Sequence, residues 1–140
     1  MTGRPFVDTN VLVYAFDAHA PAKQARALAA LEQARSAGPL VLSTQVLQEF
    51  FAVVTRKLAT PLAPEEARSA VAELASQQVV QVDPALILAA IDFGRTEQLS
   101  FWDALIVQAA ISTNCTVLLS EDLQHHRRFG RLTVVNPFLG

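Results

Sequence analysis

Four acidic residues of this 140-residue chain stand beside apolar segments, at Asp8, Glu49, Asp103 and Asp122. Asp8 follows Phe6-Val7 and precedes the apolar run 11–13, so it ends a predicted strand inside the core. A buried carboxylate without a partner costs several kcal/mol unless it is neutralised. The chain offers further acids in similar settings rather than a matching Arg or Lys. We therefore expect a cation from outside the chain to compensate Asp8.

Each acid also has an ordinary structural interpretation. Asp8 could cap the helix that follows it, and Asp103 stands in the Ser-x-x-Asp pattern of a capping box that begins at Ser100. Glu49 borders the apolar stripe of a predicted helix, where a glutamate is usually a solvated rim residue. Asp122 could be a turn acid, and its neighbour Glu121 is expected to face solvent. The combination therefore carries more information than any single residue.

The elements that must position these acids read as alternating strands and helices. Apolar and β-branched runs predict strands ending near residue 7 and at 40–42, 79–82, 116–120 and 132–135. Helical spacing, caps and prolines predict helices at 10–16, 21–37, 44–58, 64–77, 84–98 and 101–113. Such β-then-helix repeats favour an α/β fold with a mostly parallel, five-stranded sheet covered on both faces. Nothing resembling a linker interrupts residues 1–140, so we expect one domain.

A parallel sheet brings the ends of its first and fourth strands together with nearby helix N-termini. Three or four carboxylates meeting there would repel one another unless a divalent cation neutralised them. Ligation by oxygen alone excludes a thiolate or histidine zinc site and favours Mg²⁺ or Mn²⁺, which bind phosphates readily. The predicted chemistry is in-line hydrolysis of a phosphodiester.

Composition limits where such a protein works. Hydrophobic residues make up 51% of the chain and charged residues 17%, which favours a folded domain, and no apolar run is long enough to span a membrane. The N-terminus leaves no room for a signal peptide before the first strand, and Cys115 has no partner for a disulfide, so we expect a cytoplasmic protein with Cys115 in its core. A net charge of -2 gives no general attraction for nucleic acid, which must be held locally.

Four segments resemble the motifs of the PIN-domain ribonucleases, in the right order along the chain: Val7-Asp8-Thr9-Asn10-Val11, Gln48-Glu49-Phe50, Phe101-Trp102-Asp103-Ala104-Leu105-Ile106 and Leu119-Ser120-Glu121-Asp122. Within that family the chain is most similar to VapC-type toxins of toxin-antitoxin pairs. The resemblance implies an α/β/α sandwich, a Mg²⁺- or Mn²⁺-dependent endoribonuclease acting on RNA, a homodimer and a cognate antitoxin.

The resemblance also implies roles for individual residues. Asp8, Glu49, Asp103 and Asp122 would form the catalytic and metal-binding set, with Asp8 and Asp103 as direct ligands. Asn10 would orient Asp8 or a bound water, and Ser120 matches the small hydroxyl residue before the last acid. Glu121 could replace Asp122 if the loop runs differently.

Substrate binding is less well marked in the sequence. Arg127 and Arg128, with Arg131 and two histidines, form the densest basic cluster, which could hold RNA phosphates or be a solvated surface segment. Phe101 and Trp102 could stack on a base, but beside a helix start we expect them in the core.

Two other functions fit part of the pattern. A haloacid-dehalogenase-like phosphatase also places an Asp after its first strand, but its second Asp would fall where this chain has Asn10, and a suitable Lys is missing. A catalytically inactive PIN domain that only binds a partner is the alternative that is not an enzyme. Retention of all four acids argues against it.

Overall fold

The strands among residues 4–139, which the computed structural model describes, form one sheet in the order β3-β2-β1-β4-β6-β5. Its strands are β1 (Pro5–Val7), β2 (Val41–Ser43), β3 (Gln78–Val80), β4 (Val117–Leu119), β5 (Arg128–Phe129) and β6 (Leu132–Val135). All neighbouring pairs are parallel except β5 with β6. The predicted parallel sheet is therefore confirmed.

The prediction of five strands was wrong, because β5 adds a sixth. This strand is two residues long and pairs antiparallel with β6 across a tight turn in which Gly130 adopts a φ of +61°. Glycine tolerates this left-handed conformation without steric cost. A strand of that length carries no periodic pattern, and its arginine made the segment read as basic surface.

Six helices connect the described strands: α1 (Thr9–Tyr14), α2 (Pro21–Arg35), α3 (Thr44–Arg56), α4 (Pro64–Ala75), α5 (Pro84–Glu97) and α6 (Phe101–Ser112). Each begins within one residue of its predicted start. The reason is local chemistry, since side chains of Asp8, Ser43, Asp83 and Ser100 accept hydrogen bonds from the first backbone N–H groups of α1, α3, α5 and α6.

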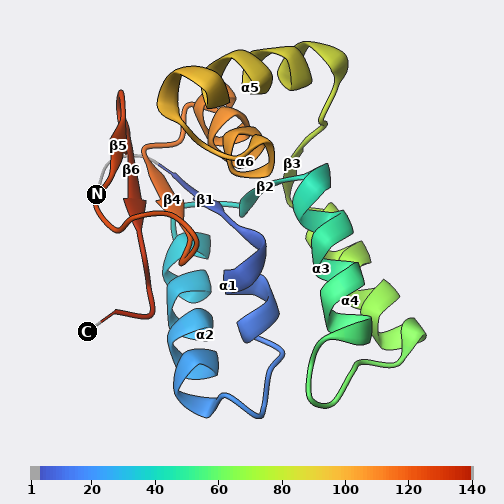
Figure 1. Cartoon of the computed structure of the whole chain (residues 1–140). Coiled ribbons are helices and arrows are strands. Elements are labelled where there is room, and N and C mark those ends of the chain that lie inside the picture. Colours follow the sequence, from blue (N-terminus) through green and yellow to red (C-terminus); the bar gives the residue numbers. More distant parts are fainter. Residues whose placement is uncertain (1–3, 140) are drawn as a thin grey trace.

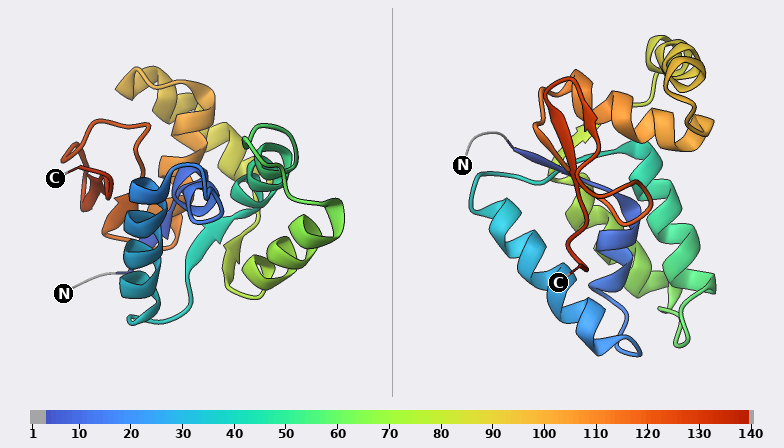
Figure 2. Two further views of the ribbon diagram at one scale, coloured as in Figure 1. Left: turned by 90° about the horizontal axis from the view of Figure 1, so that it is seen from below. Right: turned by 60° about the vertical axis from the view of Figure 1, so that its left-hand side comes forward.

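The helices cover both faces of the sheet, as the sequence predicted. In Figure 1, α5 and α6 lie above the sheet and α1 and α2 lie below it, while α3 and α4 lie together on the β3 side. The turned views in Figure 2 show the same layers, with α2 running beside the C-terminal segment. The carboxyl ends of β1, β2 and β4 therefore open onto α1, α3 and the N-terminus of α6.

Apolar side chains from the central strands form a core that water does not reach. Phe6, Leu42, Leu118 and Val134 are each 0% exposed, and Phe50 of α3 packs into the same cluster. Burying a side chain of this kind stabilises the fold by about 1.5–3 kcal/mol. The strand ends that carry the acids are thus held by rigid neighbours.

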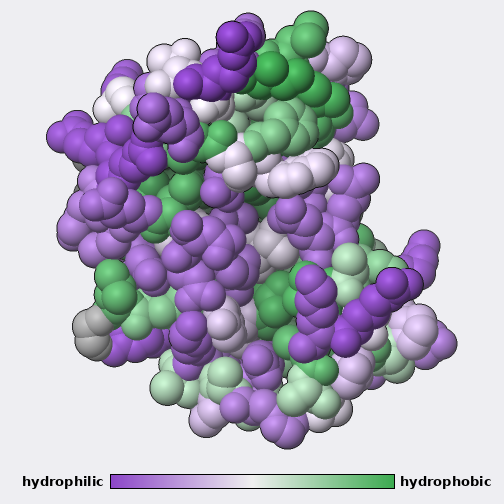
Figure 3. Space-filling view, in the orientation of Figure 1, coloured by the Kyte–Doolittle hydropathy of each residue, from purple (hydrophilic) through white to green (hydrophobic). Residues whose placement is uncertain are grey.

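Cys115 is buried as predicted, with 4% of its surface exposed. The expectation for Trp102 was wrong, because 62% of its surface is exposed, whereas Phe101 is partly buried against the α5–α6 cluster. Trp102 occupies the second position of α6, and its ring packs edge to face against that of Phe101 instead of entering the core. Figure 3 shows further hydrophobic surface over α5, where Leu88 and Ile91 are exposed.

None of the helices among residues 4–139 has the length and apolar content needed to cross a membrane.

Candidate active site

Asp8 and Ser120 lie side by side at the carboxyl edge of the sheet. In the parallel pairing of β1 with β4, Val7 is opposite Leu119, and the Asp8 N–H donates to the Leu119 carbonyl at 3.0 Å. The next residue of each strand therefore leaves the sheet at the same point. The Ser120 hydroxyl, fully buried, donates to Asp8 Oδ2 at 2.7 Å.

The Asp8 carboxylate is held by neutral donors. Oδ1 accepts from the Thr9 N–H at 2.7 Å, and Oδ2 also accepts from Asn10 Nδ2 at 3.4 Å. Asp8 is only 4% exposed, and this burial raises its pKa from 3.8 to about 7, with smaller contributions from Asp122 and Glu49. The hydrogen bonds from Ser120 and Thr9 oppose that rise. Asp8 therefore caps α1 and also has a raised pKa, as expected for a buried acid near other acids.

Glu49 reaches the same edge from the middle of α3. Its Oε1 accepts from the Thr9 hydroxyl at 2.6 Å, and its Oε2 accepts from Gln45 Nε2 at 3.2 Å. The same Gln45 nitrogen lies 3.3 Å from the carbonyl oxygen of Trp102, at the start of α6. These contacts fix the carboxylate between α1, α3 and α6. The predicted position of Glu49 at the border of the buried stripe is confirmed by its partial burial.

Asp103 occupies the third position of α6, where its backbone N–H donates to the Ser100 hydroxyl at 3.1 Å. Desolvation raises the pKa of Asp103, and the charges of Asp122 and Glu49 raise it further. The first turn of a helix favours a carboxylate through the helix dipole. Asp103 thus belongs to the same electrostatic group as the other three acids.

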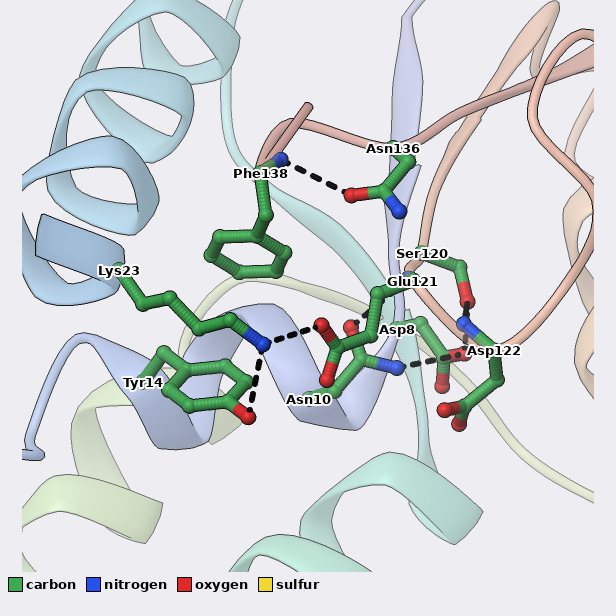
Figure 4. A network of polar contacts seen from close by, with 9 residues as sticks. All are labelled: Asp8, Asn10, Tyr14, Lys23, Ser120, Glu121, Asp122, Asn136 and Phe138. Carbon is green, nitrogen blue, oxygen red and sulfur yellow. Dashed lines mark hydrogen bonds and ion pairs between the residues drawn. The ribbon is translucent and has the colours of Figure 1, made fainter. Parts of the chain in front are cut away.

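The adjacent acids Glu121 and Asp122 point in different directions, as Figure 4 shows. The Asp122 N–H donates to the Ser120 hydroxyl at 3.1 Å, which turns its side chain toward Asp8. The Glu121 carboxylate instead forms an ion pair of 2.9 Å with Lys23 of α2. The structure therefore brings Asp8, Glu49, Asp103 and Asp122 together and directs Glu121 away from them.

The four carboxylates are oxygen donors that could contact a divalent cation, and they do not form a closed ligand shell in the described chain. Among residues 4–139, no salt bridge joins any of them to Lys or Arg, and no three acidic, His or Cys side chains stand close enough to enclose an ion. Mg²⁺ commonly keeps several waters and contacts one or two carboxylates, so this donor set fits it. Gln45 adds a buried Oε1 that has no hydrogen-bond partner in the described part of the chain.

The basic cluster lies largely away from these acids. Arg128 pairs with Thr133, which is level with Val117 at the amino end of β4, and so stands at the opposite edge of the sheet. Arg127 packs its guanidinium 4.6 Å from the centre of the Phe129 ring and donates to the Glu97 carbonyl at 3.0 Å. The structure does not bring these arginines together with the acids, and their role in RNA binding stays a prediction.

Three further residues organise the site but were not singled out from the sequence: Thr9, Gln45 and Lys23. Thr9 follows Asp8 directly, and Gln45 precedes Glu49 by one helical turn, so adjacency and i,i+4 spacing were the available signals. Lys23 is 98 residues from its partner Glu121, and no local pattern marks that contact.

Comparison with known proteins agrees with this architecture. The PIN domain family model matches residues 6–132, whereas a comparison with curated proteins gives no match. A toxin-antitoxin complex from Klebsiella pneumoniae contains a similar chain, with 16% identity, a TM-score of 0.70, and coverage of 96% of this chain and 97% of that one.

Two other solved structures have similar folds. The Mycobacterium tuberculosis toxin VapC20, described as cleaving the sarcin-ricin loop, has 19% identity and a TM-score of 0.59, covering 84% of this chain and 89% of its own. VapBC2 from Rickettsia felis, bound to a DNA fragment from its promoter, has 19% identity and a TM-score of 0.63, covering 93% and 96%. Identities this low show a shared fold, while the family match spans most of the sequence. The chain belongs to the PIN domain family.

Proposed function

We propose that this protein is a Mg²⁺- or Mn²⁺-dependent endoribonuclease and the toxin of a toxin-antitoxin pair. The observation that carries the proposal is a group of four carboxylates in which Asp8 and Asp103 each interact electrostatically with Glu49 and Asp122, without a Lys or Arg salt bridge to any of the four in the described chain. Such a group has little structural value by itself, because its members repel one another. Its chemistry suits a divalent cation and a phosphodiester substrate.

Each residue has a distinct role in this proposal. Asp8 and Asp103 would hold the cation, and Glu49 and Asp122 would lie in its surroundings. Asn10 and Ser120 orient Asp8 through the hydrogen bonds to its Oδ2. A bound divalent cation supplies Lewis-acid stabilisation of the phosphate charge and lowers the pKa of water. The protein orients the carboxylates and excludes water from the buried side of Asp8.

The names of the structural neighbours support the proposed partners. Those neighbours include a toxin-antitoxin complex, a toxin that cleaves the sarcin-ricin loop, and VapBC2 bound to a DNA fragment from its promoter. By analogy, a cognate antitoxin would bind this protein and cover the acids, and RNA would be the substrate. Residence in the cytoplasm follows from such a substrate and partner.

A homodimer is proposed from the exposed apolar surface. Leu88 is 63% exposed and Ile91 42% on α5, while Trp102 is 62% exposed on α6 and Phe51 42% on α3. Several large apolar side chains in water on neighbouring elements are typical of an interaction surface. The proposed occupant is a second copy of this chain.

The decisive experiment measures cleavage of a structured RNA by the purified protein. Reactions contain Mg²⁺, Mn²⁺ or a chelator, and Asp8→Asn serves as the matched variant because it keeps the size of the side chain. We expect cuts that require metal and disappear in the variant. A fluorescence anisotropy titration with labelled RNA, in chelator, separates loss of binding from loss of chemistry.

Other outcomes would point to the alternative functions. Intact RNA together with turnover of p-nitrophenyl phosphate would favour a phosphatase. Inactivity on both substrates, in protein shown by mass spectrometry to be free of a bound partner, would make the chain a binding module.

A further inference from the structure

The loop after β4 presents two adjacent acids, and only one of them joins the acid group. In Figure 4 the Asp122 carboxylate lies on the Asp8 side of the loop, while the Glu121 carboxylate extends toward Lys23. The Glu121 backbone N–H is also fixed, because it donates to Asn10 Oδ1 at 3.2 Å. The two side chains therefore point to opposite sides of a backbone that is held by Asn10, two residues after Asp8.

Lys23 is anchored rather than freely rotating. Its Nζ lies 2.9 Å from Glu121 Oε2 and 3.2 Å from the Tyr14 hydroxyl. The ammonium also stands 4.5 Å from the centre of the Tyr14 ring and 5.3 Å from that of Phe138, and those two rings pack edge to face. The contact with Glu121 raises the pKa of Lys23, so the side chain is a cation throughout the physiological range. Contacts with α1, the C-terminal segment and Glu121 thus hold the positive charge of Lys23 beside the acidic loop.

We propose that Lys23 is a positioning residue that holds Glu121 out of the acid group and so leaves Asp122 as the acid facing Asp8. The assignment deepens the proposed nuclease function and rests on it. Without Lys23, Glu121 would be an unpaired carboxylate one residue from Asp122, on the same loop and free to turn toward a cation. A fifth carboxylate would then compete with Asp122 for the metal.

The ion pair has little value as a stabilising contact alone. The side chains of Lys23 and Glu121 are 42% and 23% exposed, and ion pairs this open to water contribute little to stability. Removing the pair should therefore leave the fold intact. Its effect on the acid group is the larger one, because a fifth carboxylate would change which side chains surround the cation, and changes around a metal site typically alter affinity or activity by about 10–100-fold.

A direct role of Lys23 in binding RNA phosphate is the competing explanation, and the two make opposite predictions for one double variant. If Lys23 restrains Glu121, then replacing Glu121 by the neutral Gln removes the need for restraint. If Lys23 binds phosphate, the loss of its charge persists whatever stands at position 121. The double variant therefore distinguishes the roles.

The experiment compares the full chain with Lys23→Met, Glu121→Gln and the double variant that carries both changes. RNA cleavage supplies kcat and KM, and electron paramagnetic resonance measures binding of Mn²⁺ alone, without RNA. For Lys23→Met we expect kcat to fall about tenfold with an unchanged KM, and Mn²⁺ to bind as tightly as in the wild type or more tightly. The double variant should return both quantities to within about threefold of wild type. Thermal unfolding of each variant confirms that it is folded.

Three results would overturn the assignment. Wild-type kcat in Lys23→Met shows that no restraint is needed. A raised KM that Glu121→Gln does not rescue assigns Lys23 to the substrate instead. Weaker Mn²⁺ binding in Lys23→Met shows that Glu121 does not compete for the cation. A wild-type protein that neither cuts RNA nor binds Mn²⁺ is a different failure, that of the proposed function itself, and the assignment fails with it.

Discussion

The Ser120 hydroxyl donates a 2.7 Å hydrogen bond to Asp8 Oδ2 although 112 residues separate them. The same hydroxyl oxygen accepts from the Asp122 N–H at 3.1 Å. One fully buried side chain therefore joins the first acid of the site to the last.

Replacing Ser120 by Ala should destabilise the protein by about 1–3 kcal/mol, because the buried Asp8 carboxylate loses a donor and the partly buried Asp122 N–H loses its acceptor. Chemical denaturation in chelator measures the change. Ser76→Ala is the matched control, since the Ser76 hydroxyl binds its own helix at the surface, and it should change stability by less than about 0.5 kcal/mol. Equal effects of the two substitutions would contradict the role given to Ser120.

Without metal, the protein should lose stability as the pH rises from about 4 to about 7. The folded state raises the pKa of Asp8 from 3.8 to about 7, so it binds the proton more tightly than the unfolded chain does. The stabilisation is fully present below the unfolded pKa and is lost as the pH rises through the folded value. Urea denaturation in chelator at pH 5, 6, 7 and 8 measures this slope. A flat profile would show that Asp8 is ionised across the range.

Asp8→Asn should remove that slope and abolish RNA cleavage. The amide keeps an acceptor for the Thr9 N–H and carries no charge to desolvate, so the metal-free variant should be more stable than wild type by about 1–3 kcal/mol at pH 8. Cleavage should fall by about 100-fold or more. Gain of stability with loss of activity is the signature of a functional carboxylate. If Asp8→Asn is less stable than the wild type at pH 8, the main role of Asp8 is to cap α1.

Added Mg²⁺ should stabilise the wild type more at pH 8 than at pH 5, because protons and the cation compete for the same carboxylates. The shift of the midpoint of thermal unfolding with Mg²⁺ concentration measures the effect. Asp8→Asn should show a smaller shift at pH 8. Equal shifts at both pH values would place the cation elsewhere.

Thr9→Val should reduce cleavage by about 10–100-fold while the fold is kept, because valine has the same shape but cannot donate to Glu49 Oε1. Thr55→Val, on the same helix as Glu49, is the control, since that hydroxyl binds only carbonyls of its own helix. Initial cleavage rates at saturating Mg²⁺ decide the comparison. Full activity in Thr9→Val would mean that Glu49 needs no such support.

Leu88→Glu should convert the proposed homodimer to a monomer, because it places a charge in the exposed apolar surface of α5. Sedimentation velocity measures the change, and the single tryptophan, Trp102, reports local burial by its fluorescence. Leu28→Glu on α2 is the control, at a site that is also exposed. A wild type that sediments as a monomer at all concentrations would refute the dimer.

The sequence by itself determined the helices, the central strands and the position of every acid along them. Those features depend on neighbours a few residues apart: a cap such as Asp83 before Pro84, or a glutamate one turn from an apolar residue. Placing Asp8 and Ser120 at one edge also followed from the sequence, because parallel strands separated by helices bring their carboxyl ends together.

Only the tertiary structure decided which neighbours those residues have. The ion pair between Lys23 and Glu121 spans 98 residues, and nothing local distinguishes Glu121 from Asp122. The exposure of Trp102 and the distance of Arg128 from the acids depend on how α6 and the β5–β6 hairpin pack, and the adjacent sequence is compatible with either arrangement. Contacts between residues far apart in the sequence depend on how the helices and strands pack in three dimensions. The helix or strand propensity of a short segment does not predict them.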